Sequence, residues 1–186
     1  MSASDIGAAA EMGITDKVTI EYAYGGQFYG STEITAAMDT WYSNETEVVF
    51  ACGGGIFTSA AEAAAKVNGK IIGVDSDQSP IIDKYGKGMT VTSAMKSLTA
   101  TVNARLDSII FDGTWKDHVG QVENLGLVSK DDMSKNYVGL PEDTTQWNKN
   151  FGVNDYQHIS LLVLAVSSKK SRAPKAEGIP YDKGQR

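Results

Sequence analysis

Residues 71–78 of the chain read IIGVDSDQ, and residues 91–96 read VTSAMK. Each stretch begins as an apolar strand and ends in charged side chains, with Asp75 after the first strand and Lys96 after the second. In an open α/β sheet, ligands bind at the carboxyl ends of the strands. We therefore expect these two strand ends to form one side of a binding site for a polar ligand.

Short apolar strands alternate with amphipathic helices along most of the chain. The pattern predicts strands over 18–23, 47–51, 70–74 and 89–94, and helices over 34–42, 56–67, 81–85 and 98–110. Such a succession is typical of a parallel sheet that helices cover on both faces. The predicted fold class is therefore α/β, a Rossmann-like parallel sheet flanked by helices.

The two ends of the chain carry less regular patterns. They predict short strands over 120–124, 125–128 and 137–140, a helix around 6–12 and a last helix over 151–156. We expect one ligand-binding domain over 1–157 and a divergent tail over 158–186 that is partly disordered and ends in basic residues.

The composition excludes several classes of function. The 186 residues carry a formal net charge of −6, and because nucleic acids bind to basic surfaces, we expect no nucleic-acid partner. Cys52 is the only cysteine, so no internal disulfide can form, and its place after an apolar strand predicts a small buried hydrophobe. One cysteine and two histidines make a structural zinc site unexpected, and nothing indicates a cofactor. No apolar run reaches membrane-spanning length, and residues 1–5 lack the features of a signal peptide.

Two loops near the predicted strand ends have two interpretations each. The glycines at 53–55 provide either a tight turn or a close approach of the backbone to a ligand, which makes Gly53 and Gly54 candidate contacts. Their order matches neither of the common nucleotide-binding glycine motifs. Phe28, in the loop after the first predicted strand, either stacks on a planar ligand or covers the edge of the sheet.

The polar residues after the central strands also leave alternatives open. Asp75 is the best ligand candidate because it follows its strand directly, whereas Asp77 either joins it or caps the next helix, and Gln78 adds an amide. Lys96 either donates to the same ligand or forms an ion pair with Asp75. One alternative function is a metal-dependent Rossmann-like enzyme that uses Asp75 and Asp77, although no third carboxylate is near in the sequence.

Four segments carry a family resemblance: GGQF at 25–28, VVFACGGG at 48–55, IIGVDSDQ at 71–78 and VTSAMK at 91–96. Together they resemble the basic membrane lipoprotein family, solute-binding proteins that include the purine nucleoside receptors of ABC transporters. The later segments VGLP at 138–141 and WNKNF at 147–151 look like the C-terminal part of the same family.

The resemblance implies the fold of a type I periplasmic binding protein, in which two Rossmann-like lobes close on a ligand. It implies that Phe28 stacks on the base, that Gly54 contacts the ligand through its backbone, and that Asp75 and Lys96 bind the ribose hydroxyls. The expected function is that of a non-enzymatic substrate-binding component, with a purine nucleoside as ligand and a transporter permease as partner. Full-length relatives are anchored to the membrane outside the cytoplasm.

The resemblance corresponds to the second lobe of these proteins, and the lipobox cysteine of the relatives has no counterpart in this sequence. We therefore expect half of the binding cleft and weak or no nucleoside binding, because such sites bury most of the ligand when both sides are present. The exposed lobe face and the apolar segment at 159–166 also offer a surface for self-association, and a self-associating fragment that binds no ligand is a further alternative. Without the anchor, the sequence assigns no compartment.

Overall fold

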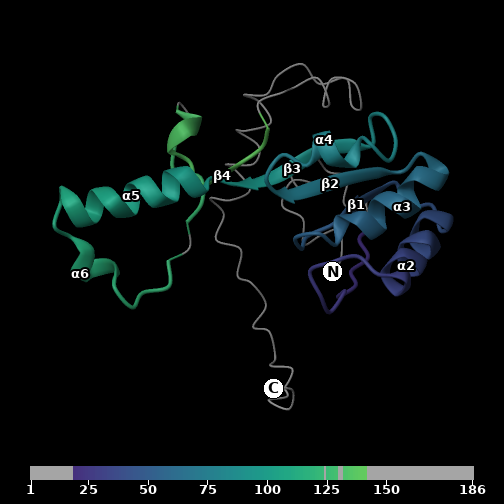
Figure 1. Ribbon diagram of the computed structural model, residues 1–186, viewed down its shortest axis with the longest axis horizontal. Helices are drawn as coiled ribbons and strands as arrows, with labels where there is room; N and C mark the ends of the chain where they lie inside the picture. Colours follow the sequence, from purple (N-terminus) through teal and green to yellow (C-terminus); the bar gives the residue numbers. More distant parts are fainter. Residues whose placement is uncertain (1–18, 124, 130–131, 142–186) are drawn as a thin grey trace, which may run out of the picture.

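The computed structural model describes residues 19–123, 125–129 and 132–141 and shows a four-stranded sheet with helices (Figure 1). The strands, in their order across the sheet, are β1 (Val48–Phe50), β2 (Lys70–Asp75), β3 (Thr90–Lys96) and β4 (Val138–Gly139). The first three run parallel, whereas β4 pairs antiparallel with the end of β3. The predicted α/β class is confirmed, with an antiparallel edge strand added to the parallel sheet.

The described residues form five α-helices: α2 (Thr32–Ser43), α3 (Phe57–Val67), α4 (Ser79–Ile82), α5 (Leu98–Ile110) and α6 (Trp115–His118). A 3₁₀ turn, η3 (Met133–Lys135), precedes β4. Ser31 caps α2, because its side-chain oxygen accepts a hydrogen bond from the Ile34 N–H at 3.3 Å. Helices α2, α3, α4 and α5 follow the predicted ones within a few residues at each end, whereas α6 was not predicted.

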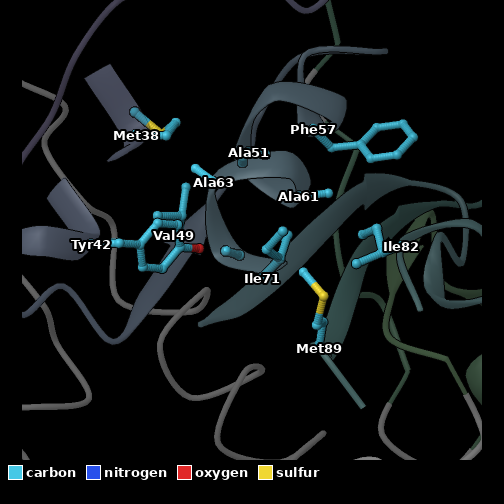
Figure 2. Packing of buried hydrophobic residues seen from close by; sticks show 12 residues of the cluster. Met38, Tyr42, Val49, Ala51, Phe57, Ala61, Ala63, Ile71, Ile82 and Met89 are labelled. Carbon is cyan, nitrogen blue, oxygen red and sulfur yellow. The ribbon is translucent and has the colours of Figure 1, made fainter. Parts of the chain in front are cut away.

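One hydrophobic core joins β1 and β2 to helices α2, α3 and α4 (Figure 2). Helix α3 contributes mostly alanines, among which Ala61 and Ala64 are fully buried. Small side chains allow the helix to lie close to the sheet, where Ile71 of β2 is also fully buried. The core therefore fixes β1 and β2 relative to the helices that precede and follow them.

Gly69, between α3 and β2, is required by the packing of Tyr42. A Cβ atom at position 69 would lie within 3.0 Å of several atoms of the Tyr42 ring. The ring cannot move away easily, because it is buried and its hydroxyl donates a hydrogen bond to the Lys70 carbonyl oxygen at 2.9 Å. The helix end itself uses Asn68, which adopts the left-handed conformation with φ of 57°.

The predicted strand over 18–23 is wrong for the residues that the structure describes. Residues 19–23 lie outside any strand, and all of them except Ile20 are exposed. A strand needs a neighbour that pairs with its backbone N–H and C=O groups. Within the described ranges β1 is the outermost strand of the sheet, so the apolar pattern of 19–23 has no partner there.

The sequence pattern predicts a sheet that helices cover on both faces, but within the described part of the chain α5 makes its main helical contacts with α6 rather than with the helices on the sheet. Helix α5 extends beyond the end of β3, away from α2 and α3, and its main helical neighbour is α6 (Figure 1). Its apolar stripe is 46–69% exposed and consists of Leu98, Val102, Leu106, Ile109 and Ile110. The helical periodicity was sufficient to place the helix, but not to decide which surface it packs against.

The segment over 120–128 contains no strand among its described residues, in contrast to the predicted pair of short strands. At the end of this segment the buried Asn136 accepts hydrogen bonds from the N–H groups of Val128 and Ser129 through its side-chain oxygen, so these two backbone groups are not available for pairing in a sheet. The predicted helices at 6–12 and 151–156, and the domain boundary at residue 157, lie outside the described residues. Among the described helices, none has the length and apolar character needed to cross a bilayer.

Candidate functional site

The carboxyl end of β1 leads into the glycines at 53–55, and the loop that contains Phe28 lies against this turn. The Gly55 N–H donates a hydrogen bond to the Phe28 carbonyl oxygen at 2.8 Å, and Tyr29 forms a bridge with Gly55. Gly54 has a positive φ of 50°, and a Cβ there would lie 3.1 Å from the Phe28 carbonyl oxygen. A glycine is therefore needed at position 54 both for the turn and for the close approach of the two loops.

The Phe28 side chain is 76% exposed. It therefore does not cover the sheet edge, which was one of its two interpretations. The exposed ring lies near the glycine turn, since its Cδ1 atom is 3.6 Å from the position of a Cβ on Gly53. This arrangement leaves an aromatic face available for stacking at the carboxyl end of β1.

Asp75 ends β2 in an unusual backbone conformation. Its φ is 69°, and the Ser76 N–H donates a hydrogen bond to the Val74 carbonyl oxygen at 2.8 Å, which closes a three-residue turn around Asp75. Residues other than glycine rarely adopt a positive φ, although aspartate tolerates it better than most. Strained conformations of this kind concentrate at functional sites.

The turn brings Asp75 against Lys96, which ends the adjacent strand β3. Asp75 Oδ1 lies 2.6 Å from Lys96 Nζ, and the two side chains are 45% and 64% exposed. The Asp75 carboxylate raises the pKa of the Lys96 ammonium through a hydrogen bond and through its charge, so Lys96 stays protonated at neutral pH. The carboxyl edge of the sheet thus presents an acceptor and a donor side by side on partly exposed side chains, although Asp75 Oδ1 itself is buried in the pair.

The side chains of Asp77 and Gln78 form hydrogen bonds with backbone groups of the protein. The Asp77 carboxylate accepts a hydrogen bond from the Ser79 N–H at 3.0 Å at the start of α4, which agrees with the helix-capping interpretation. The buried Gln78 side chain accepts from the Val74 N–H at 3.0 Å through Oε1 and donates to the Gly54 carbonyl oxygen at 3.4 Å through Nε2. Gln78 therefore links the end of β2 to the glycine turn after β1.

Cys52 is exposed, so the prediction of a buried hydrophobe is wrong. Ala51 takes the core-facing position at the end of β1, and the next residue points elsewhere. Cys52 directly follows Ala51 after β1, the strand that pairs with β2, so it lies at the same carboxyl edge of the sheet as Asp75.

Sequence reasoning missed the role of Ser93. This residue is fully buried in β3, and its hydroxyl oxygen accepts a hydrogen bond from the Gln78 backbone N–H at 3.1 Å. The available signal was a hydroxyl in the middle of an otherwise apolar buried strand, because a buried polar group needs a partner.

The candidate site is an open edge of the sheet. A depression of about 350 Å³ lies elsewhere, between α2 and α3, and none of the predicted ligand residues lines it. In the part of the chain that the structure describes, no three His, Cys, Asp or Glu side chains gather as a metal-ligand set.

Comparison with known proteins agrees with this geometry. Residues 11–156, more than three quarters of the chain, match the family described as Bmp, ABC transporter substrate-binding protein PnrA-like. No curated protein matches the chain. Members of this family are extracytoplasmic substrate-binding lipoproteins that bind a small molecule and serve an ABC transporter, and the family is non-enzymatic. The chain therefore belongs to the Bmp family of ABC-transporter substrate-binding proteins.

Proposed function

We propose that the chain binds a purine nucleoside, or a related ribose-bearing small molecule, at the carboxyl edge of β1, β2 and β3. The observation that carries this proposal is the ion pair of Asp75 and Lys96 at adjacent strand ends, in which Asp75 Oδ1 lies 2.6 Å from Lys96 Nζ and both side chains are partly exposed. The hydroxyl groups of a ribose both donate and accept hydrogen bonds. A carboxylate that accepts and an ammonium that donates, held side by side, complement two neighbouring hydroxyls.

The remaining contacts suit a planar base. Phe28 offers an exposed ring face next to the glycine turn, and aromatic rings stack on nucleobases. Gly54 allows the base or sugar to approach the backbone without a side chain in between. Because this edge encloses the ligand from one side only, we expect weak binding by the chain itself. The transporter permease is the proposed protein partner.

Cys52 provides the test, because it is the only cysteine of the chain, is exposed, and follows β1 at the carboxyl edge of the sheet. We expect guanosine or inosine to slow alkylation of Cys52 by iodoacetamide, by about twofold when the nucleoside concentration equals its Kd. The matched 2′,3′-dideoxynucleoside lacks the two neighbouring 2′ and 3′ hydroxyls and is expected to protect Cys52 far less.

The alkylation rate is followed by intact-protein mass spectrometry at increasing nucleoside concentration. Alkylation of the urea-unfolded chain, with and without nucleoside, controls for direct effects on the reagent. Equal rates with and without every nucleoside in the folded protein would refute the proposed function. Equal protection by the nucleoside and its dideoxy form would refute the role of the ribose hydroxyls.

The exposed stripe of α5 supports a second proposal, that the chain associates with another copy of itself. Monomeric proteins rarely leave a continuous apolar surface in water. We expect the purified chain to be an oligomer by light scattering coupled to size exclusion, and the double variant Val102→Glu, Leu106→Glu to be a monomer. Val67→Glu is the control, since Val67 is an exposed apolar residue on α3 outside the stripe. A monomeric unmodified chain would contradict this proposal.

A further inference from the structure

We infer that Gln78 is a positioning residue, which holds Asp75 toward Lys96 and couples Asp75 to the glycine turn at Gly54. This inference rests on the proposed function, because it concerns the same edge of the sheet. It assigns to Gln78 a role different from ligand contact. Its side chain is 8% exposed, and both ends of its amide are engaged by the protein backbone.

The hydrogen bonds of Gln78 surround the turn that carries Asp75. Its Oε1 atom accepts from the Val74 N–H, while the Val74 carbonyl oxygen accepts from the Ser76 N–H. Both backbone groups of the residue before Asp75 are therefore fixed. This constraint explains how a non-glycine residue is held at a φ of 69°.

Strand β3 also forms a hydrogen bond with Gln78. Its backbone N–H donates to the Ser93 hydroxyl oxygen, and Ser93 lies three residues before Lys96 on β3. One residue thus bonds to β2, to β3 and to the turn after β1, which are the three elements that carry the proposed contacts.

Gly73 provides the space for this arrangement. A Cβ at position 73 would lie 2.6 Å from the Ser93 hydroxyl oxygen, 2.9 Å from Gln78 Oε1 and 3.0 Å from Gln78 Cβ. Atoms do not approach this closely without displacement, so any larger residue at 73 would push Gln78 away from its partners. The glycine in the middle of β2 and the buried amide are therefore parts of one packing unit.

The test uses Gln78→Met, which keeps the length of the side chain and removes its hydrogen bonds. The readout is the pH titration of Lys96, followed by NMR of carbon-13-labelled lysine and assigned by the loss of one signal in Lys96→Met. We expect the pKa of Lys96 to fall toward that of an isolated lysine in Gln78→Met, because Asp75 is no longer held beside it. Nucleoside binding is expected to weaken about tenfold.

Thr90→Val is the matched control for a loss of stability without a change at the site. Thr90 is fully buried in β3, and its hydroxyl donates to Asp83 at 2.7 Å, at the opposite end of the strand from Lys96. We expect this variant to lower the melting temperature and to leave the pKa of Lys96 unchanged. If Gln78→Met does not fold, the same titration is made with Ser93→Ala, which removes only the acceptor of the Gln78 N–H. We expect Ser93→Ala to lower the pKa of Lys96, by less than is expected for Gln78→Met.

The two proposals fail in different ways. An unchanged Lys96 titration in folded Gln78→Met, or in Ser93→Ala when Gln78→Met does not fold, would overturn the positioning role. A lowered pKa in Thr90→Val equal to that in Gln78→Met would overturn it too, because the effect would then follow stability alone. If the unmodified chain binds no nucleoside but Gln78→Met still lowers the pKa of Lys96, the proposed function fails and the positioning role stands.

Discussion

Replacing Asp75 with alanine is expected to weaken nucleoside binding by roughly 10- to 150-fold, since a hydrogen bond to a charged group contributes about 1.5–3 kcal/mol. The measurement is a titration of the nucleoside into each variant by NMR, which detects weak binding. Asp77→Ala is the matched control, because Asp77 carries the same carboxylate two residues away but bonds to the Ser79 N–H. An equal loss of affinity in both variants would contradict the assignment of the ribose contact to Asp75.

Two different substitutions of Asp75 distinguish its role in nucleoside binding from its effect on the stability of the fold. Asp75→Gly also removes the carboxylate, yet glycine adopts a φ of 69° without strain, whereas alanine does not. We expect Asp75→Gly to be more stable than Asp75→Ala by about 1 kcal/mol, with equally poor nucleoside binding. The ion pair itself contributes little, because both side chains are substantially exposed. Urea denaturation of the two variants measures the difference, and a glycine variant that is less stable would argue against strain at Asp75.

The largest expected loss of stability comes from Ile71→Ala. Ile71 is 0% exposed at the centre of the core between β2 and the helices (Figure 2). Truncation of a buried isoleucine removes apolar contacts and leaves a cavity, so we expect the free energy of unfolding to fall by about 2–5 kcal/mol. A loss of this size is a large part of the total free energy of unfolding of a typical domain.

Ile110→Ala is the control for Ile71→Ala, since it makes the same chemical change on α5 at a residue that is 63% exposed. We expect it to change the free energy of unfolding by less than about 0.5 kcal/mol. Both variants are compared by urea denaturation followed by circular dichroism. A large loss of unfolding free energy in Ile110→Ala would show that α5 packs against another surface in solution. That result would support the proposed self-association.

The positions of Asp75 and Lys96 were predictable from the sequence because strand ends are local features. An apolar run that stops at a charged residue marks the end of a buried strand, and parallel strands place their carboxyl ends at one edge. The structure brings these two residues into contact at that edge. What the local pattern left open was whether Asp77 and Gln78 face a ligand or the backbone, since that depends on groups from β1 and β3.

Local periodicity and motif order were enough to predict most of the alternating strands and helices, the residues at the strand ends and membership of the Bmp family. Three further points depend on long-range packing and emerged from the three-dimensional arrangement. Residues 19–23 have no neighbouring strand among the described residues, the apolar stripe of α5 stays exposed, and Gln78 bonds to three separate elements. Each of these depends on partners distant in the sequence, because a strand, an apolar face or a buried amide is stabilised only by the surface that meets it.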